Sequence, residues 1–142
     1  MVAIGISIII ISIYMLSVSD NDNHVNKASL NKVNITNIKL NNEFGIEIKS
    51  IKPNQIVLIQ TDIINLQNKT QPFVYIVKVE KEGVANSISY NKGVLSPNEK
   101  VSVANSWIPQ EKGEYKITVF VWSDIDGREV LTKKKSIEVI VG

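Results

Sequence analysis

The stretch GEYKITVFVW, residues 113–122, is the most strongly patterned part of the chain and decides its fold class. Apolar and polar side chains alternate along it, and successive side chains of a β-strand point to opposite faces of a sheet. One face carries Tyr115, Ile117, Val119 and Val121. We expect this face to be buried, so the stretch is predicted to be a core strand.

The opposite face of the same stretch ends in two aromatic rings, Phe120 and Trp122. Aromatic side chains are enriched at protein interfaces because they offer a large apolar contact area. We therefore predict that the two rings form an exposed interaction surface on the outer side of the sheet. The alternative is that edge loops or the polar residues 20–33 cover the rings, or that the twist of the strand turns Trp122 into the end of the core.

The remainder of the chain from residue 34 onward repeats the two-residue period. Asn91-Lys92-Gly93 and Pro97-Asn98 are predicted turns between strands. Irregular pairing is expected at Gln60–Asp62 and at Ala104–Trp107. The other predicted strands lie in the stretches ITNIKL (35–40), FGIEIKSI (44–51), QIVLIQTDIINL (55–66), FVYIVKVE (73–80), VANSISY (84–90), KVSVANSWIP (100–109) and VLTKKKSIEVIVG (130–142).

This pattern predicts an all-β fold, with residues 34–142 forming one sandwich of seven or eight antiparallel strands of the immunoglobulin type. Parallel α/β folds are excluded, because no amphipathic helix connects the strands. In such sandwiches a tyrosine at the entry of the penultimate strand bonds back to the upstream backbone. Tyr115, two residues after Gly113, occupies that place and is predicted to form this tyrosine corner.

The N-terminal stretch, residues 1–18, contains no charged side chain and is rich in isoleucine. As a helix it would be about 27 Å long, close to the ~30 Å hydrocarbon core of a bilayer. We predict a single-pass transmembrane anchor over residues 1–19 and a polar tether over residues 20–33. A cleaved signal peptide, with its site at Ser17-Val18-Ser19, remains the alternative, although the basic residues usual before the apolar run are absent.

The motifs after residue 50 resemble the immunoglobulin-like modules related to the CARDB and fibronectin type III groups in exported proteins of ammonia-oxidising archaea. The matching residues are Pro97 after a turn, Ser106-Trp107-Ile108-Pro109, and Gly113 through Trp122. The resemblance covers about residues 50 to 141. Such proteins often carry several copies of the module, whereas this chain has one copy and an apolar segment.

This resemblance implies a domain on the outer side of the membrane, with an adhesive or spacing role and no catalytic residues. The positive-inside rule, applied to Lys27 and Lys32 alone, would place the chain after the apolar segment in the cytoplasm. We give the resemblance more weight than this rule. An alternative function is that of a filament component, since archaeal pilins and archaellum-associated proteins also join an apolar N-terminal helix to a β-sandwich. The basic processing region typical of pilins is missing here.

The composition argues against several other classes of protein. The formal net charge is only +2, without a basic stripe, so nucleic acid is not an expected partner. Cysteine is absent, which excludes disulfides and thiolate chemistry. The single histidine, His24, lies in the tether, away from any nucleophile that it would have to activate. We expect no enzyme activity and no cofactor, and we expect other membrane or cell-surface proteins as partners.

Two pairs of carboxylates deserve a comparison with metal sites. Asp124 and Asp126 resemble the opening of a calcium-binding loop, but Gly127 comes two residues early and the distal glutamate is missing. A hairpin turn is the favoured interpretation, and calcium between loop carboxylates is the alternative. Asp20 and Asp22, followed by His24, are suitable ligand types. An Asn-rich tether acquires such triplets by chance, so no metal is expected there.

Two asparagines fit the acceptor pattern for N-glycosylation, Asn34 before Ile35-Thr36 and Asn68 before Lys69-Thr70. If the domain lies outside the cell, both are candidate sites. Asn68 falls in a predicted turn and is the more accessible of the two.

Overall fold

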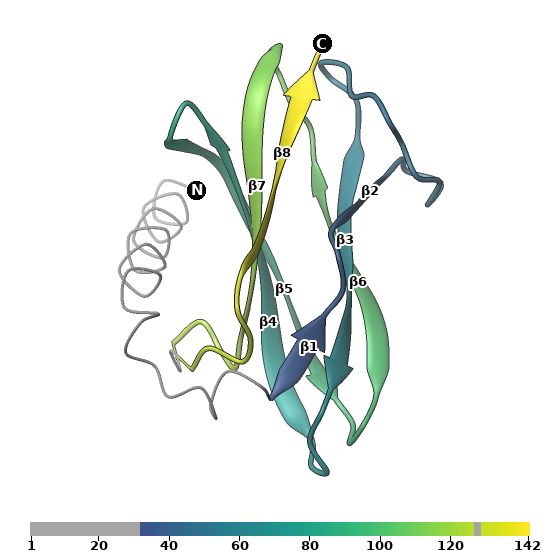
Figure 1. Ribbon diagram of the computed structural model, residues 1–142, viewed down its shortest axis with the longest axis vertical. Coiled ribbons are helices and arrows are strands. Elements are labelled where there is room, and N and C mark those ends of the chain that lie inside the picture. The colour runs from purple at the N-terminus through teal and green to yellow at the C-terminus, as the bar shows by residue number, and fades with distance from the viewer. Residues whose placement is uncertain (1–31, 127–128) are drawn as a thin grey trace.

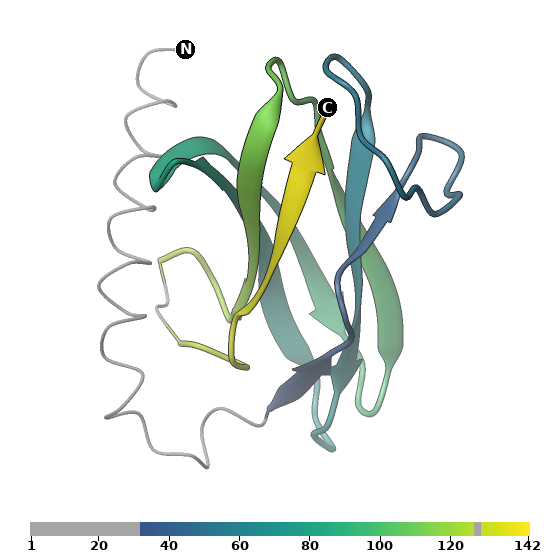
Figure 2. The same cartoon turned by 45° about the horizontal axis from the view of Figure 1, so that its top comes forward.

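A computed structural model describes residues 32–126 and 129–142, and these residues form two antiparallel sheets packed face to face (Figures 1 and 2). One sheet, the β3 sheet, contains β1, β2, β3 and β6, and the other, the β7 sheet, has the order β5-β4-β7-β8. The all-β sandwich is confirmed. The strands are β1 (Val33–Ile35), β2 (Lys39–Asn41), β3 (Val57–Asn65), β4 (Gln71–Lys81), β5 (Val84–Leu95), β6 (Lys100–Trp107), β7 (Gly113–Trp122) and β8 (Lys135–Val141).

The predicted anchor, the tether up to residue 31 and the triplet Asp20, Asp22 and His24 lie outside the described residues. Within residues 32–126 and 129–142, no helix is long and apolar enough to cross a membrane.

Strand β3 runs through the middle of its sheet without the irregularity predicted for Gln60–Asp62. Its register against β6 is unbroken from Val57 opposite Trp107 to Ile64 opposite Lys100, so the shift expected in β6 is absent as well. Alternate side chains are buried along its whole length. The central polar residues keep the two-residue period, because Thr61 occupies a core-facing position and is itself buried. A register shift does occur in β4, between Val79 and Glu80.

The turn predicted at Asn91-Lys92-Gly93 is wrong, because β5 continues through these residues to Leu95. Gly93 pairs with Phe73 across the sheet. A Cβ atom at Gly93 would lie only 2.7 Å from Cζ of the Phe73 ring. Glycine here makes room for the close approach of an aromatic side chain, which is a recognised use of glycine inside a strand.

The strand predicted over FGIEIKSI is also wrong. Apart from two isolated bridges, Asn41 to Glu47 and Ile51 to Val141, the segment is a loop. The Oδ1 atom of Asn42 accepts hydrogen bonds from the backbone N–H groups of Phe44 and Ile46. The asparagine side chain thereby satisfies two donors that a strand ladder would otherwise use, which is how such residues compete with regular structure.

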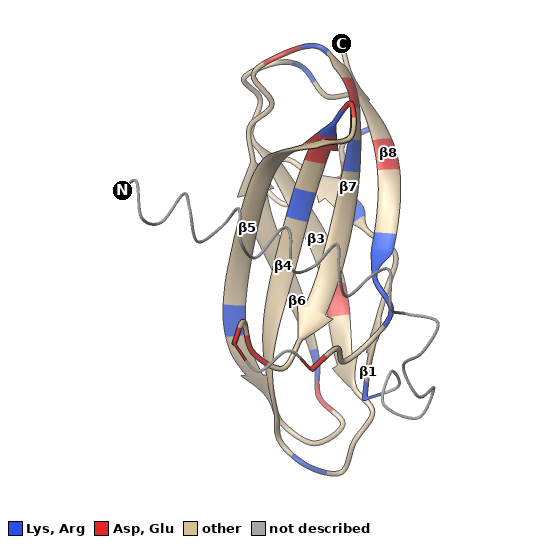
Figure 3. Cartoon of the chain, turned by 90° about the vertical axis from the view of Figure 1, so that its left-hand side faces the viewer, with Lys and Arg blue, Asp and Glu red and all other residues tan. Residues whose placement is uncertain are grey.

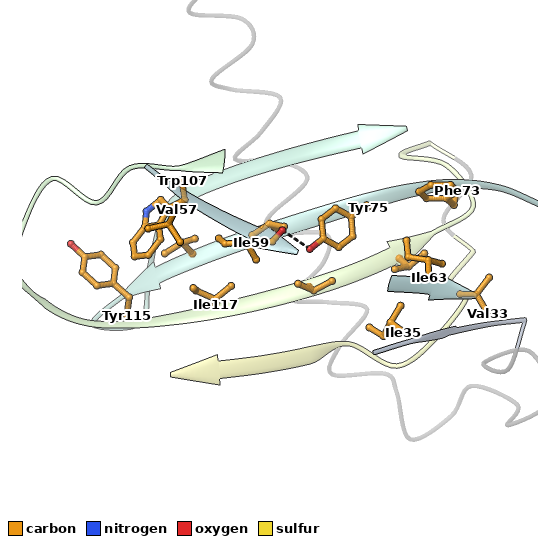
Figure 4. Close-up of a cluster of buried hydrophobic side chains, with 14 of the residues drawn as sticks. Val33, Ile35, Val57, Ile59, Ile63, Phe73, Tyr75, Trp107, Tyr115 and Ile117 are labelled. Atoms are coloured by element: carbon orange, nitrogen blue, oxygen red, sulfur yellow. Dashed lines mark hydrogen bonds between the residues drawn. The ribbon is translucent and has the colours of Figure 1, made fainter. Parts of the chain in front are cut away.

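The main core lies between the two sheets and takes the inward-facing side chains of β3, β4 and β7 (Figure 4). Tyr115, Ile117, Val119 and Val121 are all in it, so the predicted core face of β7 is confirmed. The hydroxyl of buried Tyr75 donates a 3.0 Å hydrogen bond to the Ile59 carbonyl in the opposite sheet, drawn as a dashed line in Figure 4. Burial raises the pKa of the Tyr75 hydroxyl, so it remains a donor at any physiological pH.

The predicted tyrosine corner is confirmed. The Tyr115 hydroxyl donates a 2.8 Å hydrogen bond to the backbone carbonyl of Glu111, four residues upstream. The Tyr115 ring also contacts the Trp107 ring edge to face, with ring centroids 5.1 Å apart. These contacts join the turn before β7 to the end of β6.

Replacing Tyr115 by phenylalanine should test this corner. The change keeps the ring packing and removes the hydroxyl, leaving the Glu111 carbonyl without this partner. We expect the free energy of unfolding to fall by about 1 kcal/mol in urea titrations. The exposed Tyr90→Phe serves as a matched control and should change it very little. An unchanged value for Tyr115→Phe would show that the hydroxyl does not stabilise the turn.

Asp62 on β3 makes the fold sensitive to acid. A 2.5 Å hydrogen bond from the Ser102 hydroxyl, helped by the Lys100 ammonium 3.4 Å away, lowers the pKa of the Asp62 carboxyl below its ordinary value. A lowered folded-state pKa stabilises the fold above the unfolded-state pKa, and this stabilisation is lost as the pH falls through the folded-state value. Asp62→Asn should therefore reduce the drop in melting temperature below about pH 4. The control Asp126→Asn should retain that drop.

Candidate interaction surfaces

The outer face of the β7 sheet carries Phe120 and Trp122, as predicted, but it does not expose them. Phe120 is 5% exposed and Trp122 is 1% exposed. They form a second apolar cluster with Val74 and Ile76 of the neighbouring strand β4. The expected exposed aromatic surface is therefore corrected, because these rings are buried on the outer side of the sheet.

Three partly buried side chains pack against this second cluster: Ile88 of β5, and Ile125 and Val130 of the connection between β7 and β8. That connection turns back along the end of β7, since Trp122 and Val130 form a bridge and Leu131 N–H donates to the Val121 carbonyl. Among the described residues, a loop therefore contributes to the cover of the two rings, which is the predicted alternative to an exposed surface. The period of β7 could not reveal this, because the covering residues come from elsewhere in the sequence.

A buried lysine lies beside this cluster. Lys78 of β4 has only 5% of its side chain exposed, and its Nζ is 3.1 Å from the carboxylate of Glu80 on the same face. The ammonium also lies 5.7 Å from the centre of the Phe120 ring, within the range of a cation–π contact. Thr118 is buried next to it and shares a 3.0 Å hydrogen bond with Ser136 of β8.

Charge is unevenly distributed along the two central strands of the β7 sheet (Figure 3). The upper parts of β4 and β7 carry charged positions, whereas their lower parts are uncharged. In the upper part, Lys116 of β7 stands opposite Glu80 of β4 and Glu138 of β8. Opposite charges placed across neighbouring strands favour this pairing. Together with Glu82 and Glu114, these three residues line one pocket on the surface of the sheet.

The predicted turn residues Asp124 and Asp126 are both exposed. Oδ1 of Asp124 accepts a 2.7 Å hydrogen bond from the Ile125 N–H and lies 3.3 Å from the Lys92 ammonium. These contacts lower the pKa of the Asp124 carboxyl, with the backbone hydrogen bond as the larger cause. No group of three or more metal-ligating side chains occurs in residues 32–126 and 129–142.

Both candidate glycosylation sites are accessible. Asn34 projects outward from β1, and Asn68 lies in the exposed turn between β3 and β4. The hydroxyl of Thr36, two residues after Asn34, accepts a hydrogen bond from the Asp62 N–H. The threonine of this acceptor pattern is therefore bound to β3. Glycosylation at either position remains a prediction.

Sequence reasoning missed two strongly exposed apolar side chains in the loop after β2. Phe44 is 79% exposed and Ile46 is 63% exposed. Their two-residue alternation predicts a strand for both residues. The available signal was Asn42 followed by Gly45, two residue types that favour a turn over a strand.

No protein-family model matches the sequence, and no curated protein matches it either. Solved structures do share the fold. The C-terminal domain of Wzt has a TM-score of 0.65 at 12% identity, over 79% of this chain and 74% of that one. The CARDB domain of a Pyrococcus furiosus protein, solved in complex with di-metal ions, has a TM-score of 0.56 at 18% identity, over 80% and 94% of the two chains.

The same fold occurs inside larger proteins. A β-glucosidase from Listeria innocua in complex with glucose has a TM-score of 0.51 at 15% identity, over 78% of this chain but only 16% of that one. At these identities the similarities show the fold alone. They support the resemblance to CARDB and immunoglobulin-like modules, whereas the narrower link to ammonia-oxidising archaea remains a prediction.

Proposed function

We propose that this chain is a membrane-anchored, extracytoplasmic immunoglobulin-like domain that acts as a non-catalytic interaction or accessory subunit. The observation that carries the proposal is the joining of a charge-free apolar sequence, residues 1–18, to one end of a sandwich with its own core. An 18-residue apolar stretch is long enough to hold a protein in a bilayer. A small sandwich presented in this way suits contact with other proteins.

The way in which the chain enters the sandwich supports this arrangement. Lys32 forms an ion pair with Glu129 directly before β1, and Val33 N–H donates to the Leu131 carbonyl. Both partners belong to the connection between β7 and β8. The entry point is therefore held at one end of the sandwich, beside the connection between β7 and β8.

The mature N-terminus and the membrane association of the full chain test the proposal together. Membranes from source cells should retain the chain after an alkaline carbonate wash, and mass spectrometry should find residues 1–19 still attached. Removal of these residues and release of a soluble domain would support a secreted adhesive module instead. Processing within the apolar segment, together with filaments that contain the chain, would support the filament alternative.

A further inference from the structure

The loop after β2 presents two apolar side chains on a turn of defined shape. This turn, residues 42–47, is called the Phe44 turn below. Phe44 is the most exposed large apolar side chain among the described residues, and Ile46 stands two residues away on the same turn. Exposed apolar side chains are ordinary when single, but two together on a protruding turn mark a place for contact.

The Phe44 turn is held by its own hydrogen bonds. Besides the two bonds accepted by the Asn42 side chain, at 3.0 Å and 2.9 Å, the Asn42 N–H donates to the Ile46 carbonyl at 2.7 Å. Gly45 N–H donates to the Asn42 carbonyl, and its φ of 79° is a value that favours glycine. A turn that is already ordered loses little conformational entropy on binding.

The Phe44 turn lies far from the point where the chain enters the sandwich (Figure 1). Strand β1 pairs with the end of β3, at Asn65, and β2 pairs with its beginning, at Leu58. At about 3.3 Å per residue, the two places are roughly 23 Å apart along β3. The Phe44 turn and the point of chain entry therefore lie at opposite ends of β3.

Acidic side chains flank the apolar pair. Glu43 directly precedes Phe44 and Glu47 directly follows Ile46, and both are exposed. No ion pair engages either carboxylate within residues 32–126 and 129–142. Like charges on both sides oppose approach to an anionic bilayer and favour a surface whose rim is cationic.

We propose that the Phe44 turn is the element through which this chain binds a protein partner. Phe44 and Ile46 insert into an apolar pocket of the partner, and Glu43 and Glu47 face lysine or arginine side chains at its rim. The inference rests on the proposed function, because it names the contact element of the same interaction module. It places the contact at the end of the β3 sheet and not on the buried rings of the β7 sheet.

Photo-crosslinking of the full chain in source-cell membranes tests the inference first. The photoreactive residue p-benzoylphenylalanine is placed at position 44 and, in a matched chain, at exposed Tyr90 on the β7 sheet. We expect position 44 to capture one discrete protein that position 90 does not capture. Capture of lipid or of a second copy at position 44 would overturn the proposal.

Titration of the captured and purified protein against the full chain then tests whether Phe44 anchors the contact. Phe44→Ala should weaken the affinity about 30-fold, as expected for a buried aromatic anchor, and Tyr90→Ala should leave it within twofold. Asn42→Ala should weaken it by loosening the turn, and Glu43→Lys with Glu47→Lys should slow association. An affinity insensitive to Phe44→Ala sinks the proposal. Capture at position 90 alone would refute the Phe44 turn as the contact element but would support the proposed interaction function. No capture at either position would contradict both proposals.

Discussion

Replacing Trp122 by alanine is expected to lower the free energy of unfolding by about 3–5 kcal/mol, the usual cost of removing a buried aromatic side chain. Trp122 is 1% exposed and packs with Val74, Ile76 and Phe120 on the outer side of the β7 sheet. Chemical denaturation of the full chain in mild detergent should show the change as a shift of the urea midpoint at constant slope.

Tyr90→Ala provides the matched control for this experiment. Tyr90 lies on β5, opposite Ile76 of β4, and it is 47% exposed. Its truncation should cost far less than that of Trp122, because less of its surface is removed from water on folding. Equal, small effects for both substitutions would contradict the buried second cluster and return Trp122 to an open surface.

Removing Glu80 is the second change for which we expect a large effect. Glu80→Ala leaves the ammonium of Lys78 buried with no carboxylate beside it, and breaking a buried pair in this way costs about 3 kcal/mol. The double change Lys78→Met with Glu80→Gln removes both charges and keeps the length of the side chains. It should leave the stability within about 1 kcal/mol of the original, since apolar replacement of a buried pair is often neutral.

Glu111→Gln is the control for the loss of a carboxylate. Glu111 pairs with Lys81 at 2.5 Å, but 73% of its side chain is exposed. Water and salt screen such a pair, so its loss should change the urea midpoint very little. If Glu80→Ala were as mild as Glu111→Gln, the burial of Lys78 would not be a feature of the folded protein in solution.

The main core of the sandwich could be predicted because it follows from local alternation. Tyr115 and Val119 share a face in any extended strand, and the two-residue period alone assigns them to the core. The tyrosine corner was predictable for a similar reason, since Tyr115 and its acceptor at Glu111 are only four residues apart.

The second cluster and the Phe44 turn could not be predicted in this way. Burial of Phe120 and Trp122 depends on Ile88 of β5 and Val130 of the connection after β7, which both lie outside this strand and reach the outer face only through the fold. Phe44 alternates as a strand residue should, yet the Asn42 side chain takes the backbone donors and bends the chain away from the sheet. The missing information is the pairing of distant segments in the first case and side-chain competition for backbone donors in the second.

The topology of the full chain in intact cells tests the central claim most directly. Because the chain has no cysteine, a single Val84→Cys change at the exposed start of β5 creates a unique thiol. A membrane-impermeant maleimide applied to intact cells should label this thiol, and the labelled chain should remain in the membrane fraction after an alkaline carbonate wash. Labelling only after lysis, or a labelled chain that washes off the membranes, would contradict a membrane-anchored domain on the outer side.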